Sequence, residues 1–577
     1  MGKRWDVRRP EFWTWVLLGL GLAMRLFHYL RNPSVWHDEA ALIVNVLGKS
    51  FRELLGPLFL SEAGPPLFLW LERGMCLVWG DSTYVLRLLP FLASCLALML
   101  MVPVARRFLR PEAVPWAILL MACSDKLLGH GCEAKPYVVE VLAATVLLAV
   151  FAWACNRPLG RQLSLYTLLA PILIFIAYPG CFLCGGLLLA LFPAVGQQHR
   201  KATWAGYGIL ALVILGSFAL LALGPARLQR CGPMVSCWLR QFPHWDKPWT
   251  VPGWTLFSTL DMVRYCFEPT GHVLALIAFL GALVFWRSGQ KAVAILVCGP
   301  FLLALLASFA GAYPYGGARV EVFALPGLAL LVGAGLPPLC TWVGLRCRPA
   351  SIAIAIVLLA PLALALYRLA APWPRADCQG AAQFVLANRQ RDDAITANHW
   401  EYLYYFRKAG KVFVPPKSMD LARTGPGESI SFTDELPQPN APRLWLILTG
   451  GTQSDRYRLA NAYSPVLWQT TQKHDFAMTT VFLLARHDVP ASLHAEKCSR
   501  IRENSGWANK IHPNSHEFGY KSLRASSRKS TETNQLSGGS AVVGAGVWGT
   551  GAGPAGISSG ACVDGSGAGM LGITIGP

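Results

Sequence analysis

Long apolar stretches alternate with short polar junctions over the first 370 residues of the chain. Each stretch is about 16–22 residues long, which matches the length that a helix needs to cross the hydrocarbon core of a bilayer. The pattern therefore predicts an α-helical polytopic membrane protein. Eleven spans are expected, near residues 13–30, 85–105, 113–130, 136–154, 163–179, 181–196, 203–223, 271–286, 292–311, 321–336 and 351–370.

Residues 31–84 form a long junction with a pattern of its own. The stretch DEAALIVNVLGKSFRELLGPLFL has apolar residues at helical spacing, which is typical of amphipathic helices on a membrane surface. The next segment, PPLFLWLERGMCLVWG (65–80), is short and carries Glu72 and Arg73. We expect it to lie in the interface or dip into it, because a full crossing would move every later junction to the other side.

The composition changes after residue 371, where the apolar stretches end. The transmembrane module is therefore assigned to residues 1–372, and a small α/β domain is predicted over about residues 375–490. Its expected elements are a helix at 378–389 and strands at 393–398, 411–416, 443–450 and 480–487. From residue 497 the chain is rich in Gly, Ser and Ala without periodicity, so the tail 497–577 is expected to be disordered.

Basic residues decide how the spans are oriented. The chain has a net charge of +19 and a mean hydropathy of +0.40, and in such a protein the positive-inside rule explains the excess of cations without nucleic-acid binding. Five junctions carry the basic clusters: Arg106, Arg107 and Arg110; Arg157 and Arg161; Arg200 and Lys201; Arg287 and Lys291; Arg346 and Arg348. If these face the cytoplasm, residues 31–84, 131–137, 224–270 and 313–321 and the C-terminal domain lie outside the plasma (inner) membrane.

Two adjacent carboxylates, Asp38 and Glu39, follow the first span. In the first turn of a surface helix, acids simply favour the positive end of the helix dipole, and Glu53 and Glu62 allow the same explanation. The alternative is a catalytic base at the mouth of a cavity in the membrane. Because adjacent helical residues point about 100° apart, only one of the two is expected to face inward.

Four cations are expected near the exterior ends of the spans: Arg25, Arg87, Lys135 and Arg319. Glu133 and Glu321 lie close to the last two. Each residue alone could anchor a helix end, and Arg25 could snorkel to the interface. Together they indicate an anion site, such as one for a lipid-linked phosphate, next to a general base. Tyr137 and Tyr178 are expected at the same level, where an aromatic belt is the simpler explanation.

The sequence offers no cofactor motif in a context that would support one. Several of the 16 cysteines lie inside apolar stretches, where they behave as small hydrophobic residues. The one CxxC, at residues 181–184, lies in such a stretch, and no His/Cys cluster has zinc spacing. Walker and HExxH motifs are absent, and GxGxxG occurs only in the Gly-rich tail, at 544–549, 551–556 and 567–572, where no strand is expected before it and no helix after it. Asp38, Glu39 and Glu133 could hold a divalent cation, but we expect no obligatory metal. Cys231 and Cys237, in an expected exterior loop, could form a disulfide.

Five short elements occur along the chain in this order: VWHDEA (35–40), PPLFLWL (65–71), LRLLPFLAS (86–94), EAKPY (133–137) and YPYGGARVEVFALP (313–326). With them, residues 13–370 resemble the GT-C superfamily of integral membrane glycosyltransferases, in particular family 39, the protein O-mannosyltransferase and lipid A aminoarabinose transferase type. The first element matches the family's W-x-DEA segment, and EAKPY is similar to its EARPY element. Lys135 there replaces an arginine, so the positive charge is kept and the bidentate fork is lost.

The resemblance implies an inverting glycosyltransferase that moves a sugar from a polyprenyl-phosphate donor to a lipid, glycan or protein acceptor on the exterior face. Asp38 would act as the base with Glu39 in support, because a phosphate leaving group needs no acid. The substrate-binding residues would be Arg25, Arg87, Glu133, Lys135, Tyr137, Tyr178, Arg319 and Glu321.

Two other classes of protein remain open at this point. A transporter or flippase of a lipid-linked or anionic substrate would explain the spans and the charges, and it predicts inverted repeats and helices broken near mid-membrane. A membrane assembly protein without catalysis predicts little effect of neutralising Asp38. The sugar, the acceptor and the oligomeric state do not follow from the sequence.

Overall fold

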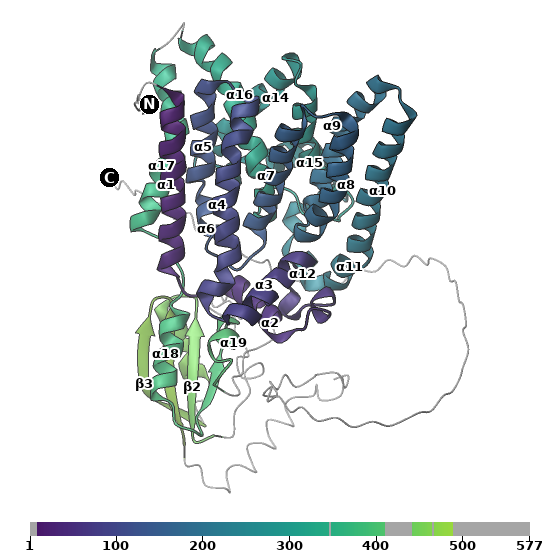
Figure 1. Ribbon diagram of the computed structural model, residues 1–577. Coiled ribbons are helices and arrows are strands. Elements are labelled where there is room, and N and C mark those ends of the chain that lie inside the picture. The colour runs from purple at the N-terminus through teal and green to yellow at the C-terminus, as the bar shows by residue number, and fades with distance from the viewer. Residues whose placement is uncertain (1–8, 345–347, 410–440, 464–466, 488–577) are drawn as a thin grey trace, which may run out of the picture. The chain divides into compact units, whose positions relative to one another are not determined.

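Long helices make up most of the part of the chain that the structure, a computed structural model, describes: residues 9–344, 348–409, 441–463 and 467–487. Figure 1 shows the apolar helices running side by side as a bundle, and one hydrophobic cluster extends through it. The helices of this bundle are α1 (Pro10–Arg31), α4 (Thr83–Phe108), α5 (Val114–Cys123), α7 (Tyr137–Ala154), α8 (Leu159–Ile176), α9 (Gly180–Gln198), α10 (Lys201–Leu223), α14 (Gly271–Arg287), α15 (Lys291–Phe309), α16 (Leu325–Gly344) and α17 (Arg348–Ala370).

The expected spans correspond to helices of this bundle. In the described part of the chain, eight helices are long and apolar enough to cross a membrane by themselves. A ninth span results if residues Pro248–Cys266, which contain α13 (Val251–Cys266), are taken together with α14 across a bend of 105°. The prediction of an α-helical polytopic membrane protein is therefore confirmed.

One expected span is not a continuous helix. The interval 113–130 is divided at Ser124 into α5 and α6 (Asp125–His130). Ser124 begins α6 as its N-cap, where its Oγ accepts a hydrogen bond from the backbone N–H of Leu127 at 3.4 Å. The same hydroxyl donates to the carbonyl of Cys266 at 2.9 Å, which ties the break to α13.

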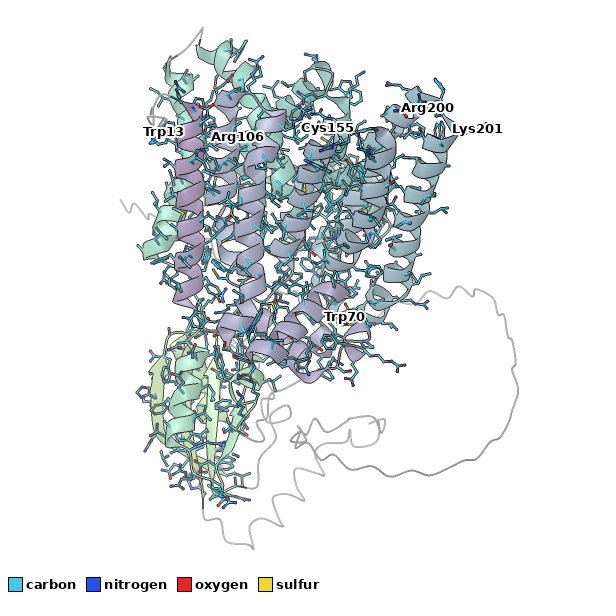
Figure 2. All side chains as sticks on the ribbon, in the orientation of Figure 1. Trp13, Trp70, Arg106, Cys155, Arg200 and Lys201 are labelled. Carbon is cyan, nitrogen blue, oxygen red and sulfur yellow. The ribbon has the colours of Figure 1, made fainter. Side chains whose placement is uncertain are left out.

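The junction 31–84 folds into α2 (His37–Gly48) and α3 (Pro66–Trp79), joined by two short 3-10 turns. Trp70 of α3 lies at one end of the bundle, and Arg106, Arg200 and Lys201 lie at the opposite end (Figure 2). This separation of the junction from three of the basic residues agrees with the orientation that the charges predict.

The disulfide considered for the loop 224–270, which is expected to be exterior, is not formed. Cys231 is a free thiol in the structure, so it is not bonded to Cys237. The short helices α11 (Pro225–Gln229) and α12 (Gly232–Cys237) occupy this part of the loop instead.

A four-stranded sheet follows the last long helix, with strand order β1-β2-β4-β3. β1 (Ala394–Ala397) is parallel to β2 (Arg443–Thr449), and the other two pairs are antiparallel. These two strands, β4 (Thr479–Arg486) and the helix α18 (Cys378–Asn388) confirm four of the expected elements. The expected strand 411–416 and the expected disordered tail 497–577 lie outside the described residues.

Both faces of the central strands are covered. One hydrophobic cluster joins Trp445 and Ile447 of β2 to α18, and a second joins Leu446 to α21 (Gln453–Ala462). β3 (Trp468–Phe476) is an edge strand whose sequence, WQTTQKHDF, is mostly polar, so the apolar pattern does not predict it.

A short helix, α19 (Glu401–Tyr405), fastens this sheet to the 31–84 junction. It packs against α2, and the hydroxyl of Tyr405 accepts a hydrogen bond from the backbone N–H of Val35 at 2.8 Å. Just after the helix, Arg407 donates from Nε to Oδ2 of Asp81 at 2.8 Å. These contacts hold the 31–84 junction, whose helix α2 carries Asp38.

Candidate active site

Asp38 is the second residue of α2, where two cations from distant parts of the chain meet its carboxylate. Oδ1 accepts a hydrogen bond from Nη2 of Arg319 at 3.1 Å, and Oδ2 lies 3.4 Å from Nζ of Lys135. Burial alone would raise the pKa of Asp38, but the two cations outweigh it and hold that pKa well below its usual range. Asp38 is therefore a carboxylate that stays ionised.

Lys135 is shared between two acids. It is buried in the turn between α6 and α7, and its Nζ donates to Oε2 of Glu62 at 2.5 Å. Burial raises the pKa of Glu62, with Lys135 opposing the rise and the nearby charge of Asp38 adding to it. Glu62 thus competes with Asp38 for the same ammonium group.

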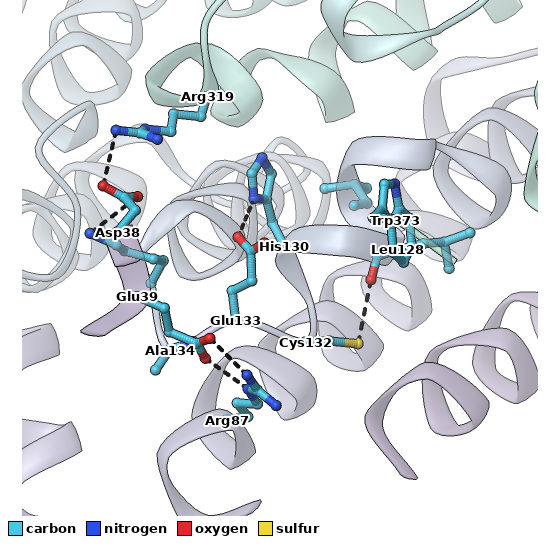
Figure 3. A network of polar contacts seen from close by, with 12 residues as sticks. Asp38, Glu39, Arg87, Leu128, His130, Cys132, Glu133, Ala134, Arg319 and Trp373 are labelled. Atoms are coloured by element: carbon cyan, nitrogen blue, oxygen red, sulfur yellow. Dashed lines mark hydrogen bonds and ion pairs between the residues drawn. The ribbon is translucent and has the colours of Figure 1, made fainter. Parts of the chain in front are cut away.

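Glu39 points away from Asp38, toward Arg87 (Figure 3). Its side chain is 0% exposed, and Arg87 binds both of its oxygens, from Nε and Nη2, at 2.7 Å each. The backbone N–H of Ala134 donates to Oε1 at 2.9 Å. Both oxygens of Glu39 are therefore occupied by protein donors.

The nitrogen atoms of Arg87 are likewise all bonded to acceptors within the protein. Besides the bidentate pair with Glu39, its Nη1 donates to Oδ1 of Asn32 at 2.8 Å and to the carbonyl of Pro33 at 2.7 Å. Arg87 therefore fixes the segment that leads into α2. Its predicted contact with a substrate phosphate would require these bonds to be exchanged.

Glu133 lies between the imidazole of His130 and the guanidinium of Arg375. Its Oε2 is 2.8 Å from Nδ1 of His130, and its Oε1 accepts from Nη2 of Arg375 at 2.7 Å. Burial opposes ionisation, but His130 and Arg375 leave the pKa of Glu133 below its ordinary value. Arg375 follows α17, and its Nη1 also lies 3.5 Å from Oε2 of Glu39, so it connects the two acids.

Aromatic rings flank Arg319. Its guanidinium carbon lies 5.8 Å from the ring centre of Tyr137 and 5.5 Å from that of Trp238. Nε of Arg319 is buried and donates no hydrogen bond to the described groups. Arg319 is therefore held by Asp38 and two rings, and its Nε–H group is still available to bind a ligand.

Glu321 and Tyr178 do not contact Asp38 but hold two backbone segments next to the groups around it. Oε2 of Glu321 accepts from the backbone N–H of Gly316 at 2.7 Å, in the loop before Arg319. A positive φ of 111° and a close Ser258 neighbour leave room only for glycine at position 316. Tyr178 donates to the carbonyl of Gly64 at 3.0 Å, beside Glu62.

Arg25 binds elsewhere, at the break between α5 and α6. Its Nη2 donates to the carbonyl of Met121 at 2.8 Å, and its Nη1 to that of Ala122 at 3.0 Å, both in the last turn of α5. Nε donates to Oγ of Ser94 at 2.8 Å. A cation at the negative end of a helix dipole is favourable there, and the structure does not bring Arg25 into contact with Asp38.

The structure thus gathers Asp38, Lys135, Arg319 and Tyr137 in one cluster and gives the other predicted residues supporting positions. Three members of the surrounding network are missing from the sequence-based set: Glu62, His130 and Arg375. A cation just after the last span, at the expected exterior end, was the signal that could have identified Arg375. In the described chain, no group of three or more His, Cys, Asp or Glu residues is arranged to hold a metal ion, and the expectation of no obligatory metal stays a prediction.

No protein-family model matches the chain, and no curated protein matches it. Among solved structures, it is similar to the crystal structures of ArnT from Cupriavidus metallidurans in the apo state and bound to undecaprenyl phosphate. Both have a TM-score of 0.46, identities of 13% and 12%, and coverage of 81% of this chain and 97% and 98% of those chains. It is also similar to the apo form of the Archaeoglobus fulgidus oligosaccharyltransferase, with a TM-score of 0.43, 12% identity and coverage of 69% of this chain and 63% of that chain.

Proposed function

We propose that the protein is an inverting glycosyltransferase that moves a sugar from a polyprenyl-phosphate donor to an acceptor hydroxyl at the exterior end of its helices. The observation that carries the proposal is the position of Asp38 between Lys135 and Arg319. These residues come from three of the sequence elements that resemble GT-C enzymes of family 39. A base beside two cations is the arrangement that transfer from a phosphate-linked sugar needs.

In the proposed reaction, the bond between the anomeric carbon and the phosphate oxygen breaks while the acceptor oxygen bonds to that carbon from the opposite face. The acceptor hydroxyl gives its proton to Oδ2 of Asp38, the oxygen that accepts no hydrogen bond in the structure. The phosphate leaves as an anion on the lipid and is held by Lys135 and Arg319. Because the leaving group is already a stable anion, the reaction needs no acid.

The donor itself would activate the base. In the free protein, the cations hold the pKa of Asp38 low, so the carboxylate attracts protons only weakly. A phosphate bound to Lys135 and Arg319 would neutralise part of their charge and raise the proton affinity of Asp38. Glu62, which also binds Lys135, would hold that ammonium group in place when no donor is bound.

The remaining predicted residues have supporting roles in this proposal. Glu39 and Arg87 fix the start of α2 through their bidentate pair. Glu133 links the 131–136 turn to Arg375. Tyr137 orients Arg319, and the proposal places the site and the C-terminal domain on the exterior face of the plasma membrane.

A transfer assay with purified full-length protein tests the assignment of Asp38. The probes are radiolabelled polyprenyl-phosphate mannose and polyprenyl-phosphate aminoarabinose, the two donors that the family resemblance suggests. Asp38→Asn should lower the rate of transfer about 100- to 10,000-fold. Glu53→Gln, which neutralises an exposed acid of the same junction, should leave the rate unchanged. Full transfer by a folded Asp38→Asn variant would refute the proposal.

A transporter is the second candidate, because the break at Ser124 is of the kind that transporters use at their substrate sites. Here, however, Arg25 binds two of the carbonyls that the break exposes, and Ser124 caps the helix that follows. The same donors in proteoliposomes distinguish the two functions. A flippase would move the intact lipid across the bilayer, and a transferase would separate the labelled sugar from it.

A further inference from the structure

A groove of about 590 Å³ lies between α1 and α4. It is formed by two residues of α1 and five of α4. One of these, Arg106, lies at the same end of the bundle as Arg200 and Lys201 and at the opposite end from Trp70 (Figure 2). The groove is therefore separate from the cluster around Asp38 and has no part in the proposed transfer reaction.

The greater part of the groove is apolar. Trp15 and Leu18 form its wall on α1, and Met99, Val102 and Pro103 form its wall on α4. Trp15 is 44% exposed and Met99 is 43% exposed, so both present apolar surface on the outside of the bundle. Pro103 has no N–H to bond the carbonyl of Met99, so the groove lies where the backbone hydrogen bonds of α4 are interrupted.

Two arginines form the remaining side of the groove. The guanidinium carbon of Arg106 lies 5.1 Å from the ring centre of Trp15, in a cation–π contact. Nη2 of Arg107 donates to Oδ1 of Asn156 at 3.2 Å and to Sγ of Cys155 at 3.1 Å. These partners are neutral, and the described lining residues include no carboxylate. The positive charge of the groove is therefore not compensated within its own lining.

We propose that this groove binds an anionic phospholipid. The headgroup phosphate lies between Arg106 and Arg107, and an acyl chain lies along Leu18, Met99 and Val102. The planar forks of arginine match phosphate oxygens in pairs, and basic pockets between helices at the cytoplasmic side suit acidic headgroups. A zwitterionic lipid offers the same acyl chain without the net negative charge, so the arginines select against it.

The test measures the thermal unfolding midpoint of the purified full chain in detergent with added lipid. Phosphatidylglycerol should raise the midpoint in a saturable way, and phosphatidylcholine with the same acyl chains should not. The double variant Arg106→Gln/Arg107→Gln should weaken the apparent affinity for phosphatidylglycerol about tenfold or more. Met99→Trp, which fills the groove without changing its charge, should weaken it too.

The double variant Arg200→Gln/Lys201→Gln is the matched control, because it removes two charges at the same end of the bundle outside the groove. It should keep the affinity of the unmodified protein. An equal loss in this control would refute the groove as the binding site, because general attraction would then explain the effect. Equal stabilisation by inorganic phosphate alone would refute a lipid as the ligand. If a groove variant unfolds in lipid-free detergent, the variant Arg106→Lys/Arg107→Lys is measured in its place. It keeps both charges and should retain part of the affinity for phosphatidylglycerol.

Discussion

Asp38 and Glu39 are neighbouring acids on one helix, and the groups around them give them different properties. The side chain of Glu39 is 0% exposed and that of Asp38 is 15% exposed. Arg87 and the backbone of Ala134 satisfy both oxygens of Glu39, but Oδ2 of Asp38 accepts no hydrogen bond. The turn of about 100° between adjacent helical residues thus separates a satisfied carboxylate from one that can still bind a proton.

The buried pair of Glu39 and Arg87 predicts a large loss of stability when Glu39 alone is neutralised. Glu39→Gln should lower the free energy of unfolding by about 3–5 kcal/mol, because it leaves the buried guanidinium of Arg87 without its counter-charge. Glu39→Met/Arg87→Met should cost less than Glu39→Gln, since no buried charge is left. Unfolding in detergent measures both, with Asp38→Asn as a partly exposed comparison. A Glu39→Gln variant with unchanged stability and no transfer activity would instead assign Glu39 to catalysis.

The pH dependence of transfer should depend on the cations around Asp38. Because its folded pKa lies below the ordinary value, Asp38 stays ionised as the pH falls through the range in which a free aspartate is protonated. Arg319→Gln removes one of the two cations, so the pKa of Asp38 rises and the acidic limb of the kcat/KM profile moves to higher pH. Arg240→Gln, an exposed residue of the 224–270 loop, should not move that limb. An unmoved limb in Arg319→Gln would mean that another group titrates.

At the scale of elements, the positions of the helices could be predicted from the sequence and their interruptions could not. A long apolar stretch folds as a helix wherever it packs, because its backbone must bond internally in the membrane. From the sequence alone, Ser124 could equally have faced a neighbouring helix within a continuous span. What stabilises the break is Arg25 of α1, which donates hydrogen bonds to two carbonyls in the last turn of α5. β3 could not be predicted either, because an edge strand that is exposed on both faces needs no alternation of apolar and polar residues.

Replacing Arg25 distinguishes a structural role from substrate binding. Arg25→Lys cannot bond Met121, Ala122 and Ser94 together, so the free energy of unfolding should fall by about 1.5–3 kcal/mol. The KM for the donor should stay the same. Arg31→Gln, which alters an exposed cation of the same helix, is the control and should change neither value. If Arg25→Lys raised the KM and left the stability unchanged, the prediction that Arg25 binds the donor phosphate would be supported instead.

At the scale of the whole molecule, the site depends on pairings between segments far apart in the sequence. The sequence could predict that acids and bases gather at one membrane depth, because buried charges are costly and indicate function. It could not predict which acid meets which base. Glu62 pairs with Lys135, and Arg375 pairs with Glu133, only because the 31–84 junction and the segment after α17 pack on the same turn. Sequence spacing carries no information on such contacts.

The orientation of the chain is the last property that the proposal requires. Single-cysteine variants can report it: Glu53→Cys in the 31–84 junction, Lys473→Cys in β3 and Lys201→Cys in a basic junction, all at exposed positions. On intact cells, a membrane-impermeant maleimide should label the first two above the level of the unmodified protein. It should label Lys201→Cys only after permeabilisation, because the basic junctions stay in the cytoplasm. Labelling of Lys201→Cys from outside would place the cluster around Asp38 in the cytoplasm. Labelling of Glu53→Cys but not of Lys473→Cys would place the sheet on the opposite side of the membrane from that cluster.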